Sequence, residues 1–194
     1  MNKNSLIPLP LLLFALAFSL LLPVLQQFKP ILLYHRDAVL AGEAWRLLTG
    51  NLVHTNDYHL YLNLAGLWVF LLLCGSVITI KLLISSIFIS GISIGCALLL
   101  LHPEIRWYAG LSGVLYGLFI IGAVCLALTG EIFSFFALLA LIFIKLGSVW
   151  LGETDDLTQN MIQAKIIDEA HIYGAIAGFL TATPLSFKRL KQTV

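Results

Sequence analysis

Apolar runs of about 20 residues alternate with shorter polar segments along most of the sequence. About 20 consecutive apolar residues are needed for a helix to cross the hydrocarbon core of a bilayer. The pattern therefore predicts an all-α membrane protein with a bundle of six transmembrane helices in a single domain, residues 1–194. The expected spans are 7–25, 58–77, 82–101, 112–128, 132–151 and 169–187.

Composition agrees with this class and excludes others. Hydrophobic residues make up 60% of the 194 and charged residues only 11%, whereas a soluble domain carries about 25% charged residues. The net charge of +1 leaves no basic footprint for nucleic acid, so the expected partner is the lipid bilayer. The three cysteines lie inside apolar runs without metal-ligand spacing, which predicts no metal site and leaves a disulfide open.

Charge placement predicts the orientation. Six spans would put both termini on one side, together with Lys3, Lys81 and the basic residues near 188–191. The positive-inside rule makes that side cytoplasmic, although several basic residues lie on the opposite side. The first run is interpreted as an uncleaved helix, because its Ala15-x-Ala17 pattern falls mid-run and not after it.

Two longer polar segments interrupt the alternation. Residues 26–57 are too long for a turn, and we expect this segment to be partly folded, with Trp45 beside Arg46 in the headgroup zone where tryptophan is favoured. Residues 152–167 read as a polar loop before the sixth span.

A few polar residues fall at the expected outer ends of the spans. Ser112 opens the fourth run next to Gly110 and Gly113, and a serine there is either a helix N-cap or a nucleophile. His59 and Asn63 are four residues apart and share one helix face. Strongly polar groups inside a membrane are costly, so their convergence at one depth predicts a site.

Glycine spacing suggests how the fourth and sixth spans meet. Gly113 and Gly117 on the fourth span, and Gly174 and Gly178 on the sixth, form small-xxx-small pairs that let helix backbones approach closely. If the two spans pack through these faces, the serine of the fourth and the histidine of the sixth come within hydrogen-bond reach.

That contact would supply acyl-transfer chemistry. Ser112 would be the nucleophile and His171 the general base, while His59, Asn63 and the backbone N–H of Ser112 could donate to a developing oxyanion. Asp168 lies three residues before His171 and could be a third acid. We favour a role in the first helical turn, where a carboxylate complements the dipole.

The sequence resembles the rhomboid intramembrane serine proteases along nearly its whole length. The matching motifs, in chain order, are Trp45-Arg46, His54-x4-His59-x3-Asn63, Gly110-Leu111-Ser112-Gly113 with Tyr116, and Ala170-His171-x2-Gly174-x3-Gly178. The resemblance implies a Ser112–His171 dyad without a third acid, a cofactor or a metal. It also implies an oxyanion site at His59 and Asn63, with Tyr116 packed on the His171 ring. Trp45 and Arg46 would be structural and His54 supporting.

More narrowly, the chain resembles the rhombosortases, which are short, have six spans and lack a soluble cytoplasmic domain. This resemblance implies a multi-pass protein of the bacterial inner (cytoplasmic) membrane with cytoplasmic termini and a site opening to the periplasmic side. The implied substrate is a membrane-anchored secreted protein whose C-terminal tail carries a Gly-Gly motif, a transmembrane helix and basic residues.

Two other classes of membrane protein fit the sequence less well. A catalytically inactive rhomboid-like chaperone or adaptor typically lacks the serine or the histidine, and both are present in this sequence. A channel or transporter would need polar residues continuing across the membrane, but the inner halves of the runs are almost purely apolar.

Overall fold

The computed structural model describes residues 7–140 and 156–190, with side chains described up to residue 183. Its elements are α1 (Leu9–Leu25), η1 (Gln26–Phe28), α2 (Lys29–Leu32), β1 (Tyr34–His35), α3 (Arg36–Leu40), α4 (Arg46–Thr49), α5 (Asp57–Cys74), α6 (Ile80–Leu101), β2 (Trp107–Tyr108), α7 (Ser112–Thr129), α9 (Asp156–Ile162) and α10 (Asp168–Leu190). Residues 132–140 are also helical.

Within the described residues, four helical segments are long and apolar enough to cross a membrane: Leu9–Leu32, Asp57–Cys74, Ile80–Leu101 and Ser112–Thr129. They confirm the all-α membrane class. The expected fifth span begins in the helix at 132–140 and continues outside the described residues. The sixth corresponds to α10, whose 23 residues reach about 34 Å at 1.5 Å per residue. The count of six is compatible with this arrangement and stays a prediction.

The second and third spans differ slightly from their expected limits. The second was expected to reach residue 77, but α5 ends at Cys74 because the chain turns at Gly75. The third begins two residues early, at Ile80, because the Thr79 hydroxyl caps α6 by accepting from the Leu82 N–H at 3.2 Å. Pro23 lies inside α1, two residues before its end.

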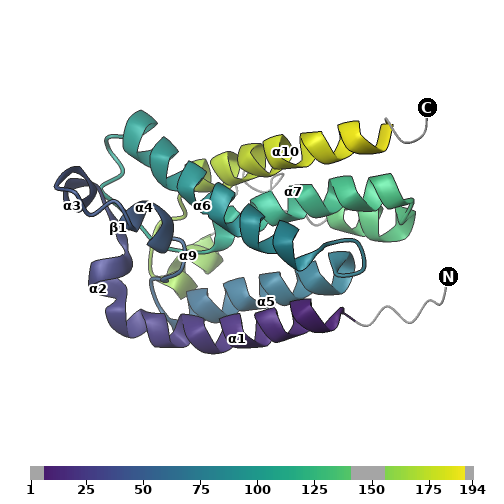
Figure 1. Cartoon of the computed structure of the whole chain (residues 1–194). Coiled ribbons are helices and arrows are strands. Elements are labelled where there is room, and N and C mark those ends of the chain that lie inside the picture. Colours follow the sequence, from purple (N-terminus) through teal and green to yellow (C-terminus); the bar gives the residue numbers. More distant parts are fainter. Residues whose placement is uncertain (1–6, 141–155, 191–194) are drawn as a thin grey trace.

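Figure 1 shows how the long helices lie together. The helix α7 runs beside α10, α6 crosses them, and α5 lies between α7 and α1. The first turns of α1 and the last turns of α10 lie at the same end of the bundle (right in Figure 1), and the small elements β1, α3 and α4 lie at the other. Both ends of the helical bundle therefore share a side, as six crossings would require.

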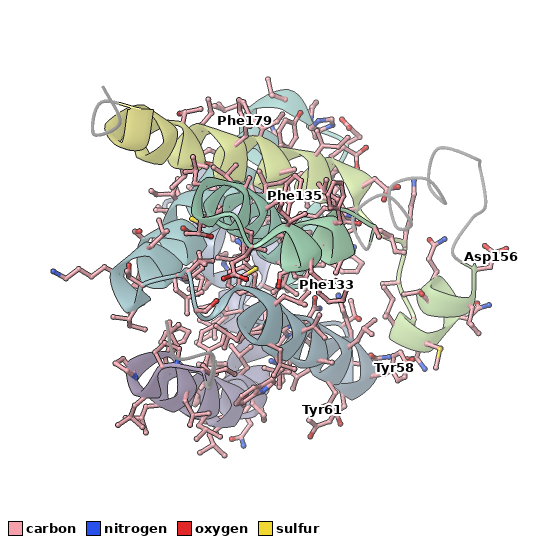
Figure 2. All side chains as sticks on the ribbon, turned by 90° about the vertical axis from the view of Figure 1, so that its right-hand side faces the viewer. Tyr58, Tyr61, Phe133, Phe135, Asp156 and Phe179 are labelled. Carbon is pink, nitrogen blue, oxygen red and sulfur yellow. The ribbon has the colours of Figure 1, made fainter. Side chains whose placement is uncertain are left out.

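Large apolar side chains cover the outside of the bundle. Phe133 is 87% exposed, and Leu20, Leu72 and Phe179 are also exposed. Figure 2 shows Phe179 on the outer side of α10 and Tyr61 pointing away from the bundle on α5. So many exposed large apolar side chains are costly in water and suit a lipid environment.

The segment between α1 and α5 is folded, as the sequence indicated. The buried Arg46 guanidinium donates to the carbonyl oxygens of Pro30 at 3.0 Å and Leu33 at 2.8 Å, and pairs with Glu43 at 2.6 Å. The Trp45 indole N–H donates to the Ile31 carbonyl at 3.0 Å. Both side chains thus tie α4 to the chain around α2.

The structure corrects the expectation for the segment 152–167 and answers the open question of a disulfide. The segment 152–167 is not simply a loop, because residues 156–162 form α9; a helix this short has no room for an apolar periodicity that a sequence could reveal. The disulfide left open by the sequence is not formed, since Cys74, Cys96 and Cys125 are all free.

Candidate active site

A tight loop presents Ser112 at the start of α7. Gly110 has φ +134°, a conformation that favours glycine, and its carbonyl oxygen accepts from the Tyr108 hydroxyl at 2.6 Å. The next backbone N–H, that of Leu111, points to Nε2 of His54 at 3.4 Å. Ser112 is the first helical residue, and Leu111 occupies the N-cap position. Of the two roles left open for this serine, the N-cap is therefore wrong.

Glycines bring α7 and α10 into backbone contact. A Cβ built at Gly174 would overlap the carbonyl oxygen of Gly113, and one built at Gly178 would overlap that of Gly117. A Cβ at Gly113 would in turn lie 2.7 Å from the carbonyl oxygen of Ala170. The two small-xxx-small faces meet as their spacing predicted, and they leave no room for side chains between the helices.

This close packing brings the predicted pair together. Nε2 of His171 lies 2.9 Å from Oγ of Ser112, a hydrogen-bond distance. The Tyr116 ring stacks on the imidazole with 4.6 Å between ring centroids and 19° between planes. His171 is only 7% exposed. Its burial and the stacking of Tyr116 on one face of its ring together hold the imidazole toward the serine.

Asp168 lies near the same histidine but does not hydrogen-bond it directly. Its Oδ1 is 3.6 Å from Nδ1 of His171, too long for a hydrogen bond, and its side chain is 48% exposed. Asp168 and Glu169 occupy the first turn of α10, the position where carboxylates complement the helix dipole.

The second polar pair, His59 and Asn63, lies across from the serine on α5. Both side chains are buried, and the Asn63 amide donates to the His59 carbonyl at 3.0 Å. They line one cavity of about 360 Å³ together with Ser112 and His171. The four side chains that the sequence suggested for the chemistry therefore share one space.

His54 lies one step back from this cavity. Its ring meets that of His59 edge-on at 5.1 Å between centroids, and its own backbone N–H donates to Oε1 of Gln26 at 2.8 Å. Burial above all, and then the neighbouring His59 and Lys29, lower the pKa of His54 to about 3. A neutral ring here can accept from the Leu111 N–H, which supports the loop before Ser112.

Other site residues were not singled out from the sequence. Tyr108 and Thr55 both line the cavity, as do Ile162 of α9 and Lys165 in the chain that follows. Of these residues, only Tyr108 carried a signal in the sequence, because it lies close to Gly110. The predicted structural residues Trp45 and Arg46 lie away from the cavity, in the folded segment before α5.

The described residues contain no cluster of metal-ligating side chains. No group of three or more histidine, cysteine, aspartate or glutamate side chains within the described ranges could hold a metal ion.

Residues 41–188 match the model of the Rhomboid domain. The match covers more than half of the chain and includes all four cavity side chains described above. No curated protein matches the chain.

Proposed function

Since this chain belongs to the rhomboid family, whose members are intramembrane serine proteases, we propose that it is itself an active protease with a Ser112–His171 dyad. The observation that carries the proposal is the 2.9 Å contact between Nε2 of His171 and Oγ of Ser112 in a shared cavity. A nucleophile within hydrogen-bond reach of a base is the arrangement that serine proteases need.

The reaction follows from that contact. As Oγ of Ser112 attacks a peptide carbonyl carbon, its proton passes to Nε2 of His171. The resulting imidazolium gives the proton to the leaving nitrogen, and an acyl-enzyme remains on Ser112. A water molecule then attacks the ester, with His171 acting again as base, and releases the new C-terminus. The Tyr116 ring fixes the plane in which the imidazole works.

The tetrahedral intermediate needs hydrogen-bond donors around its oxygen. Asn63, the backbone N–H of Ser112 and, when Nε2 carries a proton, His59 are the groups we assign to that role. The start of α7 adds the positive end of the helix dipole. Asp168 is assigned to the first turn of α10 and not to the reaction.

The substrate is proposed to be a membrane-anchored protein that enters from the bilayer. Within the family, the rhombosortase-like motifs of this sequence favour a secreted protein with a C-terminal Gly-Gly motif, a transmembrane helix and a basic tail. The proposed setting is the bacterial inner membrane, with cytoplasmic termini and the cavity opening to the periplasmic side.

Co-expression with a Gly-Gly-tailed candidate tests this function, with mass spectrometry of the new C-terminus as readout. We expect cleavage near the Gly-Gly motif by the wild type and none by Ser112→Ala. A matched substrate with the Gly-Gly motif replaced by Leu-Leu should stay intact. Cleavage of both substrates would support the protease and contradict the sorting role. Intact substrate in every arm, with the protein folded in the membrane, would favour an inactive chaperone or adaptor instead.

A further inference from the structure

Thr55 connects the polar pair on α5 to the short helix α9. Its hydroxyl lies 2.7 Å from the carbonyl oxygen of Ile162, the last residue of α9, and 3.0 Å from Nδ1 of His59. The sequence separation between Thr55 and Ile162 is 107 residues. One hydroxyl thus touches both a cavity-lining imidazole and a neighbouring backbone carbonyl.

Counting protons fixes the state of the imidazole. A hydroxyl has one proton, and a carbonyl oxygen can only accept, so the Thr55 proton points to Ile162. The Thr55 oxygen must then accept from Nδ1–H of His59. The imidazole is buried, and its polar contacts among the described residues include no carboxylate, so we take it as neutral. Its Nε2 therefore carries no proton while α9 is docked.

The unprotonated nitrogen lies next to the nucleophile loop. A Cβ built at Gly110 would fall 2.9 Å from Nε2 of His59, so this edge of the ring faces the turn that precedes Ser112. A lone pair at that place repels an oxyanion, whereas an N–H stabilises it. In the arrangement described, His59 is therefore an acceptor and not the donor that its position suggests.

The backbone around Thr55 and its hydroxyl are bonded to different parts of the chain. On one side, the backbone around it is fixed, because Lys29 Nζ donates to the Thr55 carbonyl at 2.9 Å and Gln26 accepts from the N–H of His54. On the other side, α9 is linked to the start of α5 by the Thr55 hydroxyl and by the Asn56 amide, which donates to the Met161 carbonyl at 2.8 Å. The hydrogen bonds that hold the Thr55 backbone therefore do not involve α9.

We propose that Thr55 is a positioning residue that makes the donor capacity of His59 depend on whether α9 is docked. The proposal rests on the proposed function for its catalytic meaning. When α9 shifts and Ile162 leaves, the Thr55 hydroxyl rotates and donates to Nδ1 of His59. One proton leaves Nδ1 for a cavity water, another arrives at Nε2 from water, and the ring stays neutral. Nε2–H then faces the oxyanion, so the site is completed only when α9 makes way for substrate.

Nitrogen-15 NMR of histidine-labelled protein in detergent tests this directly, because protonated and unprotonated imidazole nitrogens resonate in separate ranges. The free protein is studied as Ser112→Ala, and the His59 signals are assigned by their loss in His59→Gln. We expect Nδ1 of His59 to be protonated in this background. Adding Thr55→Val, which keeps the shape without the hydroxyl, should move the proton to Nε2, and Thr55→Ser should restore it to Nδ1.

A second arm uses the wild type after reaction with a fluorophosphonate, whose tetrahedral adduct imitates the intermediate. There we expect Nε2 of His59 to be protonated. An Nε2-protonated His59 in the free protein, or a Thr55→Val spectrum unchanged from its parent, would overturn the role of Thr55. Failure of the wild type to react with the fluorophosphonate would instead contradict the proposed function, and the free-protein spectra would still decide the assignment of Thr55.

Discussion

The two sides of the cavity are built by different kinds of contact. On one side, α7 and α10 touch backbone to backbone at four glycines, and Ser112 and His171 project from that contact. On the other side, α5 and α9 are linked through the side chains of Thr55 and Asn56 to carbonyl oxygens at the end of a seven-residue helix. The first contact cannot open without losing close packing, whereas the second depends on a few hydrogen bonds.

This difference separates two tasks. Proton transfer from Ser112 to His171 needs a fixed distance, and backbone packing provides one. Substrate entry and oxyanion binding need a region that can change, and side-chain hydrogen bonds worth about 0.5–1.5 kcal/mol each can be exchanged at small cost.

Removing either member of the dyad should have the largest effect. Ser112→Ala and His171→Ala should each lower the cleavage rate by roughly 10⁴-fold or more, and the double variant should lose little further, because the two residues act as one unit. Cleavage of a transmembrane substrate in detergent, normalised to folded protein, measures this. Substantial turnover by Ser112→Ala would show that another nucleophile is at work.

Placing a methyl group in the glycine contact should cost both folding and activity. In Gly174→Ala the new Cβ meets the Gly113 backbone, so we expect about 1–3 kcal/mol of destabilisation from overpacking. Gly66→Ala is the matched control, because its Cβ meets only the end of the flexible Leu115 side chain at 2.9 Å. Thermal unfolding in detergent compares the two; equal melting temperatures would mean that the helices are not held by this contact.

Two buried asparagines distinguish catalysis from packing. Asn63→Ala removes a proposed oxyanion donor and should lower kcat roughly 10²–10³-fold with near-normal melting. Asn51 is also buried, but its amide donates to backbone carbonyl oxygens of α4 and to the Gly91 carbonyl at 3.2 Å, away from the cavity. Asn51→Ala should therefore lower the melting temperature with little change in rate per folded molecule. The opposite pattern for Asn63 would make it a packing residue.

Acid should act on stability through His54, with a smaller effect. The folded protein holds the pKa of His54 near 3, whereas in the unfolded chain it returns to about 6.5. Because the pKa of His54 is lower in the folded protein, the unfolded chain binds the proton first as the pH falls. The contribution of neutral His54 to stability is therefore complete above pH about 6.5 and is lost progressively toward pH about 3. His54→Gln should melt lower than wild type at pH 7.5 and show a smaller loss between pH 7.5 and 5. Equal pH dependence in both proteins would remove His54 as a cause.

The backbone-packed side of the site was largely predictable from sequence. Ser112 and His171 each begin an apolar run on the same expected face, and the spacing of Gly113 with Gly117 and of Gly174 with Gly178 encodes the contact that joins them. Both signals are local in sequence, so they can be recognised without knowledge of the fold. The structure brings these residues together as expected, although their catalytic roles stay predictions.

The side-chain-linked side was not predictable in the same way. Thr55 owes its position between His59 and Ile162 to a contact across 107 residues, and nothing in its immediate sequence marks it. The helix α9 is too short and too polar to show a period, and the pairing of Tyr34 with Tyr108 in β1 and β2 involves only two residues per strand. Such features come from tertiary contacts, which a single sequence does not show.

The most direct test of the central claim is labelling by a fluorophosphonate probe followed by peptide mass spectrometry. We expect one adduct, on Ser112, in the detergent-solubilised wild type. We expect none in His171→Ala, because the hydroxyl is not nucleophilic without its base. Gly66→Ala should label like the wild type and serves as the control for handling. An adduct on Ser112 that forms equally well without His171, or no adduct in a folded wild type, would contradict the account.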